Sequence, residues 1–311
     1  MAENINVAFA VNNAYAQHLC TAIVSMADNN REHFFHVKIL SNDFSEEAQN
    51  NLRAVQKDFP NFDFEVVSVD EELFKNLKIT IDRITVQTYY RYVIAELFPE
   101  MDKCLYLDAD LVVNGDLGPL WREDLTGYYA AGVEDVFILS KDYKKHIGFG
   151  AEDLYVNAGM LLMNLAEIRK DKLVGELFAK TAELADVIDY QDQDILNIVF
   201  RGKIKQVDNI YNFTSSDYKF NRKRAPEAVV IHYTGSIKPW NMKQKSRNKL
   251  ASIYHKYVLL TPYRDFEKAY RKSIFWSRFF ARIEVKAKKR VRYRILGIQI
   301  SLPSRNVKKT A

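Results

Sequence analysis

The sequence predicts an α/β fold in which helices cover both faces of a sheet. Over the first part of the chain, short apolar runs typical of strands alternate with stretches of helical spacing. Strands are predicted at residues 5–11, 34–40 and 62–69. Helices are predicted at residues 15–29 and 45–58, the second with Ser45 as a favourable N-cap. This βαβαβ order is typical of a parallel sheet that binds its ligands at the carboxyl ends of the strands.

The turn after the first predicted strand has no glycine-rich phosphate loop. Residues 10–14 contain no glycine. Both the dinucleotide fingerprint and the P-loop need glycines there, so the sequence disfavours nicotinamide enzymes and P-loop enzymes.

The remaining elements continue the same alternation without an internal repeat. A helix is predicted at residues 85–98, before Pro99, and a buried strand at residues 103–113. Further strands are predicted at residues 128–136, 160–165, 203–207 and 229–233, and helices at residues 166–185 and 195–200.

The composition is that of a soluble globular protein. The chain has 311 residues, of which 48% are hydrophobic and 27% are charged. Its two cysteines, Cys20 and Cys104, lie far apart in apolar segments, which predicts neither disulfides nor a zinc site. No secretion signal begins the sequence and no apolar run is long enough for a transmembrane helix, so we expect a cytoplasmic protein.

The charge is distributed unevenly, which predicts two parts. Residues 263–311 contain 15 Lys or Arg and three acidic residues, a balance of +12, whereas residues 1–262 carry −7. Apolar side chains recur within this basic segment at Phe266, Tyr270, Ile274, Phe275, Phe279 and Ile283. We therefore predict a globular domain at residues 1–262 and a basic amphipathic helical tail at residues 263–311, followed within it by a β-like run at 296–302. Such a tail is typical of a peripheral anchor on the anionic inner face of the cytoplasmic membrane, and RNA binding is the alternative.

Two acidic residues, Asp108 and Asp110, interrupt the apolar strand at 103–113. On an extended chain this spacing places both on one face, about 6.5–7 Å apart at Cα. Carboxylates so close together need compensation, and a divalent cation that also binds phosphate oxygens supplies it. The alternative is a pair of solvated acids at the end of a strand. A second pair with the same spacing occurs at Asp192 and Asp194.

Several motifs, taken in order, resemble those of the family 8 glycosyltransferases, in particular the bacterial lipooligosaccharide α-galactosyl- and α-glucosyltransferase type. The matching segments are residues 9–15, 88–91 (TYYR), 105–110 (LYLDAD), 157–164 (NAGMLLMN), 190–197 (YQDQDILN), 232–235 (HYTG) and 238–240 (KPW). Their order and spacing are those of the family over most of residues 5–240.

The resemblance implies a GT-A fold, a Rossmann-like mixed sheet that binds a nucleotide sugar. It implies a UDP-hexose donor, a Mn²⁺ or Mg²⁺ ion, and transfer to a hydroxyl of a glycan or glycolipid with retention of anomeric configuration. Galactose and glucose both remain compatible with these motifs.

The resemblance also assigns residues to the donor site. It implies Asp108, Asp110 and His232 as the metal ligands and Lys238 as a phosphate contact. The full set of expected donor-binding residues is Ala10, Asn12, Tyr15, Arg91, Asp108, Ala109, Asp110, Asn157, Ala158, Asp192, Gln193, His232, Gly235 and Lys238. Gly235 would let the backbone approach the phosphate, and Trp240 would pack beneath that loop.

Asp192 and Gln193 are the expected catalytic residues. Asp192 would bind donor hydroxyls, and Gln193 would lie beside the anomeric carbon. Because a neutral amide is a poor nucleophile, we favour attack by the acceptor on the face from which the diphosphate leaves. A double displacement would need a carboxylate, and Asp192 is the candidate.

The sequence departs from the better-known relatives at the nucleotide and acceptor sides. Asn12 and Asn13 stand where those relatives carry acids, and Ala14 stands where an asparagine is expected, which weakens the inference of UDP selectivity. Arg83 replaces a histidine of the galactosyltransferase type, so a different acceptor is expected.

Two other classes compete with a glycosyltransferase. A glycoside hydrolase would need two carboxyl groups roughly 5–9.5 Å apart and no nucleotide. A nucleic-acid-binding protein led by the basic tail would leave the ordered motifs unexplained.

Overall fold

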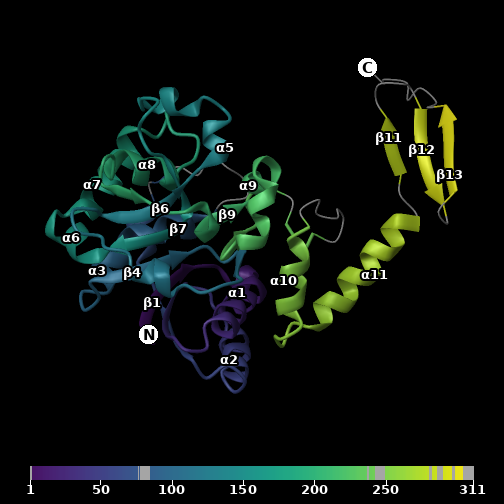
Figure 1. The fold of residues 1–311 in the computed structure, drawn as a ribbon, viewed down its shortest axis with the longest axis horizontal. Helices are drawn as coiled ribbons and strands as arrows, with labels where there is room; N and C mark the ends of the chain where they lie inside the picture. The colour runs from purple at the N-terminus through teal and green to yellow at the C-terminus, as the bar shows by residue number, and fades with distance from the viewer. Residues whose placement is uncertain are drawn as a thin grey trace.

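A seven-stranded mixed sheet forms the centre of the computed structural model (Figure 1). The structure describes residues 2–75, 77, 85–236, 238–241, 249–279, 282–285, 290–295 and 298–303. The strands are β1 Asn4–Ala10, β2 Phe34–Leu40, β3 Phe62–Val67, β4 Lys103–Leu107, β6 Ala130–Glu134, β7 Val156–Asn164 and β8 Ile204–Gln206. Their order is β3-β2-β1-β4-β7-β6-β8, and β7 runs antiparallel to both of its neighbours. The predicted parallel βαβαβ unit is therefore one half of a mixed sheet.

Alternating side chains of the strands feed two separate cores. In β4, Leu105 and Leu107 pack into one cluster, whereas Cys104 and Tyr106 pack into the other. Helices α1 Ala16–Asn29, α2 Glu46–Val55 and α10 Ala251–Val258 cover the first cluster. Helices α3 Ile94–Leu97, α6 Leu165–Lys170, α7 Leu173–Glu183 and α8 Asp192–Val199 cover the second. A strand buried on both faces is apolar throughout, which explains the continuous apolar runs of the sequence.

Local signals fix the ends of several elements. The hydroxyl of Ser45 accepts a hydrogen bond from the backbone N–H of Ala48, so the predicted start of α2 is confirmed.

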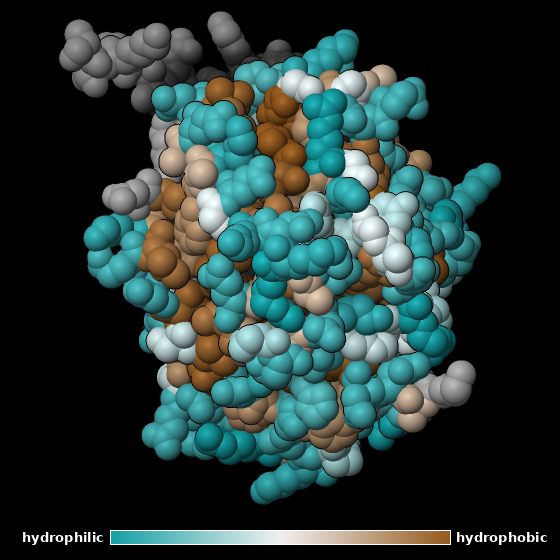
Figure 2. Space-filling view, turned by 90° about the vertical axis from the view of Figure 1, so that its left-hand side faces the viewer, coloured by the Kyte–Doolittle hydropathy of each residue, from teal (hydrophilic) through white to brown (hydrophobic). Residues whose placement is uncertain are grey.

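The face over α6 and α7, turned toward the viewer in Figure 2, is mostly hydrophilic, with apolar residues in narrow bands between polar ones. That pattern is typical of a solvated surface.

The strand predicted at residues 103–113 is two strands. It breaks after β4, and β5 Leu111–Val113 joins a second sheet with β9 Phe213–Thr214 and β10 Val230–His232. Asp108 and Asp110 lie in the break, because the chain must turn there to leave one sheet for the other.

The helix predicted at residues 85–98 is mainly a 3₁₀ helix, η3 Val86–Val93, continued by α3. Tyr89, Tyr90, Arg91 and Tyr92 are all buried. The predicted helix is therefore confirmed in its extent, but most of it is wound as a 3₁₀ helix.

Shorter elements connect the layers. They are η1 Asn13–Tyr15, η2 Glu71–Phe74, α4 Gly118–Trp121, α5 Val136–Leu139, η4 Tyr143–Ile147, η5 Asn209–Asn212, α9 Ser215–Phe220 and η6 Arg222–Glu227.

The C-terminal segment begins with the predicted helix and ends in strands. Helix α11 Asp265–Phe279 leads to an antiparallel sheet of β11 Arg282–Val285, β12 Arg290–Ile295 and β13 Ile298–Pro303, drawn apart from the body in Figure 1. The expected helix to Ile283 is therefore wrong beyond Phe279, since the chain turns back into paired strands. The β-like run predicted at 296–302 is confirmed from Ile298 onward, where β13 pairs with β12. Tyr263 and Phe266 pack against the first core cluster, and no helix within the described ranges is long and apolar enough to span a bilayer.

Candidate active site

A cavity of about 510 Å³ opens where β1 and β4 end and β7 begins. This is the edge of the sheet at which α/β proteins bind ligands. All residues expected to contact a donor line it, namely Ala10, Asn12, Tyr15, Arg91, Asp108, Ala109, Asp110, Asn157, Ala158, Asp192, Gln193, His232, Gly235 and Lys238. Two of the positions at which the sequence departs from the better-known relatives are not part of this lining. Asn13 accepts a hydrogen bond from the Ser45 N–H at the start of α2, and Arg83 lies outside the described residues.

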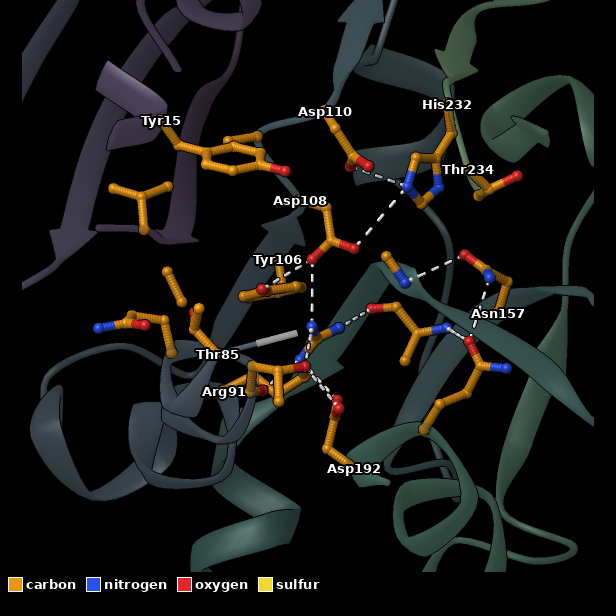
Figure 3. Close-up of a pocket in the computed structure, with 18 of the residues that line it drawn as sticks. Tyr15, Thr85, Arg91, Tyr106, Asp108, Asp110, Asn157, Asp192, His232 and Thr234 are labelled. Atoms are coloured by element: carbon orange, nitrogen blue, oxygen red, sulfur yellow. Dashed lines mark hydrogen bonds and ion pairs between the residues drawn. The ribbon is translucent and has the colours of Figure 1, made fainter. Parts of the chain in front are cut away.

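The side chains of Asp108, Asp110 and His232 converge at one side of the cavity (Figure 3). His232 Nε2 lies 3.0 Å from Asp110 Oδ1 and 3.7 Å from Asp108 Oδ2. One ligand atom from each residue falls within 4.8 Å of the others. The pairing of β10 with β5 brings them together, because His232 sits opposite Leu111. Two carboxylates and an imidazole form a donor set that suits a transition metal better than Ca²⁺.

Asn212 orients His232 from behind. His232 Nδ1 lies 2.9 Å from Asn212 Oδ1, and the Asn212 amide is itself oriented because its Nδ2 donates to Asn157 Oδ1 at 3.0 Å. An amide oxygen accepts, so Nδ1 carries the hydrogen and Nε2 faces the two carboxylates. A metal-binding histidine needs this arrangement, with its second nitrogen held by a hydrogen bond.

Because Gly159 has no side chain, it leaves room for His232 and Asp108. A Cβ at this position would lie 2.2 Å from His232 Cε1 and 2.7 Å from Asp108 Oδ2. Only glycine lets β7 pass this close to the two side chains, which is an independent sign that the residues fit a metal. Gly159 lies within the motif at residues 157–164, but the residue was not singled out.

Lys238 neutralises Asp110. Its Nζ pairs with Asp110 Oδ2 and donates to the backbone oxygen of Tyr233 at 2.7 Å. Burial alone would raise the pKa of Asp110, but the charges of Lys238 and His232 outweigh it and hold that pKa well below its usual range. Gly235, at φ +85°, makes the turn that returns the chain toward the cavity.

Arg91 joins the metal cluster to Asp192. Its guanidinium donates to Asp108 Oδ1 at 3.1 Å and to the backbone oxygen of Ala158, and it lies 3.0 Å from Asp192 (Figure 3). It also lies over the ring of Tyr106 at 4.3 Å. Arg91 is 4% exposed, so it is a buried hub and not an arginine that extends to solvent.

Asp192 is a buried carboxylate at the start of α8. Burial raises its pKa to about 6, although Arg91 and a hydrogen bond from Thr88 oppose the shift. Gln191, just before it, has φ +52°, a strained conformation for a residue other than glycine. The chain therefore stores strain directly beside Asp192.

Gln193 is hydrogen-bonded in every direction that its amide offers. Oε1 accepts from Asn157 Nδ2 and from the Ala158 N–H, each at 3.1 Å. Nε2 donates to Asp135 Oδ2 and to the Tyr155 hydroxyl, each at 3.2 Å. The amide is thus a fixed wall of the cavity in this state.

The second acidic pair does not form a second metal site. On helix α8, positions two apart point in different directions, so Asp192 faces the cavity while Asp194 accepts hydrogen bonds from Tyr143 at 2.7 Å and Tyr155 at 2.5 Å. On the extended segment, by contrast, the same spacing brings Asp108 and Asp110 together.

A separate group of Glu32, His33 and Asp116 has the residue types of a metal site, but both imidazole nitrogens of His33 are already used. Nδ1 accepts from the Glu3 N–H at 3.2 Å, and Nε2 lies 3.0 Å from Asp116 Oδ1. This group ties α4 to the N-terminus.

Further residues that were not predicted line the cavity or support it. Val11, Thr85, Gln87, Thr88, Tyr106, Gly159, Tyr190, Thr234 and Ser236 also line it, and Asp135, Tyr155 and Asn212 hold lining residues from behind. Thr88 and Tyr106 lie inside the motifs that carried the resemblance, so their position was a usable signal. Trp240, expected to pack beneath the loop, stacks on His18 with ring centroids 3.7 Å apart.

Comparison with known proteins agrees with the predicted family. The sequence profile of Glycosyl transferase family 8 matches residues 6–244. A putative glycosyltransferase of Haemophilus influenzae is 32% identical over 250 residues, which cover 78% of this chain and 74% of that protein. The lipopolysaccharide 1,2-glucosyltransferase of Escherichia coli is 28% identical over 288 residues, which cover 87% of this chain and 83% of that protein.

The fold is also that of a solved glycosyltransferase. The crystal structure of the galactosyltransferase LgtC, in complex with donor and acceptor sugar analogs, matches with a TM-score of 0.75 and 29% identity. The match covers 83% of this chain and 96% of that chain. The predicted GT-A fold is therefore confirmed, and neither the hydrolase nor the nucleic-acid-binding alternative gains support. The chain is an enzyme of glycosyl transferase family 8.

Proposed function

We propose that this enzyme transfers a hexose, galactose or glucose, from a UDP-sugar to a hydroxyl of a lipid-linked or surface glycan such as lipooligosaccharide, with retention of anomeric configuration. The observation that carries the proposal is the convergence of Asp108, Asp110 and His232 on a cavity at the carboxyl ends of β1 and β4. The names of the relatives support it, since they act on lipopolysaccharide or bind donor and acceptor sugars.

Asp108, Asp110 and His232 would hold a divalent cation, Mn²⁺ or Mg²⁺, with the imidazole favouring Mn²⁺. When bound, the ion would supply Lewis-acid stabilisation of the charge that grows on the leaving diphosphate. Lys238 already neutralises Asp110 in the free enzyme. The Lys238 ammonium, which lies at the cavity, would pair with the diphosphate of the donor.

The side chain of Asn12 favours binding of a uracil base, although the better-known relatives carry an acid at this position. Its Oδ1 is buried at the cavity and has no hydrogen-bond partner among the residues described. A buried acceptor left alone is costly, and the N3–H of uracil would satisfy it. Burial, with the charges of Asp110 and Asp108, raises the pKa of the nearby Tyr15 to about 12, so its hydroxyl stays protonated as a donor.

In the favoured reaction, the acceptor oxygen forms its bond to the anomeric carbon on the face where the bond to the diphosphate breaks. The acceptor proton passes to the leaving diphosphate oxygen. Asp192 would bind donor hydroxyls, and the fixed Gln193 amide would stabilise the oxocarbenium-like centre. A double displacement through Asp192 would require the carboxylate to give up its ion pair with Arg91.

We further propose that residues 263–311 hold the enzyme at the inner face of the cytoplasmic membrane. The support is their charge balance of +12 and the lipid-linked acceptors of the proposed reaction. This places the enzyme in the cytoplasm as a peripheral membrane protein.

A donor-hydrolysis assay tests the function without knowledge of the acceptor. The full chain is incubated with UDP-galactose or UDP-glucose, with Mn²⁺ or with EDTA, and released UDP is measured while NMR follows the anomer of the released sugar. We expect one donor to be hydrolysed only with the metal and the sugar to appear first as the α anomer. Turnover that is unaffected by EDTA, or a β anomer as first product, would contradict the proposal.

A further inference from the structure

The loop that follows β10 brings Lys238 to the cavity. The next two residues, Pro239 and Trp240, contact side chains that do not line the cavity. Lys238 pairs with Asp110 on the inner side. On the outer side, the backbone oxygen of Pro239 lies 3.1 Å from His255 Nε2, on helix α10. The carbonyl adjoining the expected phosphate-binding lysine is therefore fixed by a side chain that does not line the cavity.

His255 is in turn fixed by the C-terminal segment. Its Nδ1 lies 2.5 Å from Glu267 Oε2 on α11. The two ring nitrogens of His255 thus face the carbonyl oxygen of Pro239 and the carboxylate of Glu267, so the ring bridges the Lys238 loop and α11.

Glu267 is built into this contact. It is 4% exposed, and its Oε1 accepts from Arg271 Nε at 2.7 Å, one turn further along α11. Tyr270, on the same face of the helix, stacks on the His255 ring with centroids 4.2 Å apart. A buried carboxylate with two hydrogen-bonding partners holds a defined geometry.

The other end of the loop is held by the body of the protein. Trp240 stacks on His18 of α1, and His18 Nδ1 lies 2.8 Å from the hydroxyl of Tyr254. Tyr254 and His255 are consecutive on α10, so this helix reaches α1 with one side chain and α11 with the next. Tyr15, which lines the cavity, also meets the Trp240 ring edge-on at 6.3 Å.

We propose that Glu267 and His255 are positioning residues of the donor site, through which α11 holds the Lys238 loop in place for a nucleoside diphosphate. The inference rests on the proposed role of Lys238 as a phosphate contact. It gives the C-terminal segment a second role besides anchoring, because contacts of α11 then set how tightly the cavity binds its donor.

The test compares Glu267→Ala with Lys268→Ala in the full-length chain. Lys268 is the neighbouring residue on α11 and pairs only with exposed Asp265 in the contacts described, so it is a matched control. Binding of UDP in the presence of Mn²⁺ is measured by calorimetry, well below the melting temperature. We expect Glu267→Ala to weaken binding by about fivefold or more and Lys268→Ala to leave it unchanged.

A conservative variant separates positioning from a purely structural role. Glu267→Gln keeps an oxygen that accepts from His255 Nδ1, so its affinity should lie between those of wild type and Glu267→Ala, even if the alanine variant folds poorly. Equal UDP affinity in wild type, Glu267→Gln and Glu267→Ala would overturn the inference.

Hydrogen exchange without nucleotide tests directly whether Glu267 holds the Lys238 loop. It also distinguishes failure of this inference from failure of the proposed function. The amides of Lys238, Trp240 and Asn241 should exchange faster in Glu267→Ala than in wild type or Lys268→Ala. Unchanged exchange would overturn the inference that Glu267 and His255 hold the Lys238 loop. If wild type fails to bind UDP with Mn²⁺, the proposed function fails, whereas faster exchange in Glu267→Ala would still support the role of Glu267 and His255.

Discussion

His232 Nε2 lies 3.0 Å from Asp110 Oδ1, although 122 positions separate the two residues in the chain. The antiparallel pairing of β10 with β5 produces this contact, because His232 is opposite Leu111, the residue after Asp110. The second, small sheet is thus the element that assembles the candidate metal site.

Gly159→Ala should destroy this site. The new Cβ would lie 2.2 Å from His232 Cε1, so either the imidazole or β7 must shift. We expect a loss of about 1–3 kcal/mol in the free energy of unfolding and loss of metal-dependent UDP binding. Denaturant titration and calorimetry measure the two effects.

Gly175→Ala is the matched control for that change. Gly175 lies within α7, and an added Cβ meets nothing within 4 Å among the described residues. It should stabilise the chain by roughly 0.5–1 kcal/mol and leave UDP binding intact. A Gly159→Ala variant that binds metal and UDP like wild type would show that the crowding is relieved without cost.

Asn212→Ala should weaken metal binding without removing a ligand. The change frees His232 Nδ1 and with it the orientation of the ring, and losses of this kind amount to about 10–100-fold in metal affinity. Manganese affinity can be followed by electron paramagnetic resonance of the free ion. Asn209→Ala, on the same 3₁₀ helix, should retain wild-type affinity, because the Asn209 side chain bonds Asp217 and Arg224 and not His232 in the contacts described. An unchanged affinity in Asn212→Ala would mean that the second nitrogen of His232 has no role.

Asp192 should give the stability of the enzyme a specific pH dependence. Burial raises its pKa to about 6, well above the usual value of a carboxyl group, so the folded chain retains a proton that the unfolded chain has lost between about pH 4 and pH 6. Stability therefore falls as the pH rises through this window. Relative to Asp192→Asn, wild type should lose about 2 kcal/mol of unfolding free energy between pH 4 and pH 7. Denaturant titrations of both proteins at the two pH values measure this, and a pH-independent difference would contradict it.

Removal of residues 280–311 should abolish binding to anionic vesicles and leave the body folded. These residues carry ten Lys or Arg and one Glu. The cut follows α11, because Tyr263 and Phe266 pack on the core and a cut at residue 262 would also cost stability. Co-sedimentation with vesicles of phosphatidylglycerol, with phosphatidylcholine vesicles as control, is the measurement. A shortened chain that still sediments with the anionic vesicles would place the contact elsewhere.

Much of the fold could be predicted because the sheet is buried on both faces. The strand at residues 34–40 and the start of α2 at Ser45 were predicted as they are found, since a continuous apolar run and an N-cap are local signals. The helix at residues 85–98 was predicted as well, but not that Val86–Val93 is a 3₁₀ helix, because the spacing of apolar residues does not distinguish the two helix types. Strands β11 and β12 were missed because the apolar and basic residues there also fit a helix, whereas the run that forms β13 was predicted.

The candidate site could be predicted as far as its motifs reach. Asp108, Asp110 and His232 were expected together from the resemblance, and the cavity does contain them. Asn212 and Gly159 were not singled out, because their importance lies in the side chains that approach them in the folded chain. Those approaches arise once β10 has paired with β5 and β7 with β4. Strand register, which no local pattern of the sequence encodes, decides those approaches.

The most direct test of the account is the thermal stability of the full chain with UDP and Mn²⁺, with Mn²⁺ alone, and with UDP and EDTA. Each condition is measured on wild type, on Asp110→Asn and on Asp63→Asn, an exposed control on β3. Ligand binding to the native state adds about 2.7 kcal/mol at a hundredfold excess over Kd. The account predicts stabilisation that needs UDP and metal together, that is retained in Asp63→Asn and that is lost in Asp110→Asn. Stabilisation by UDP that persists in EDTA or in Asp110→Asn, or no stabilisation of wild type by UDP with Mn²⁺, would contradict a metal-dependent donor site at Asp108, Asp110 and His232.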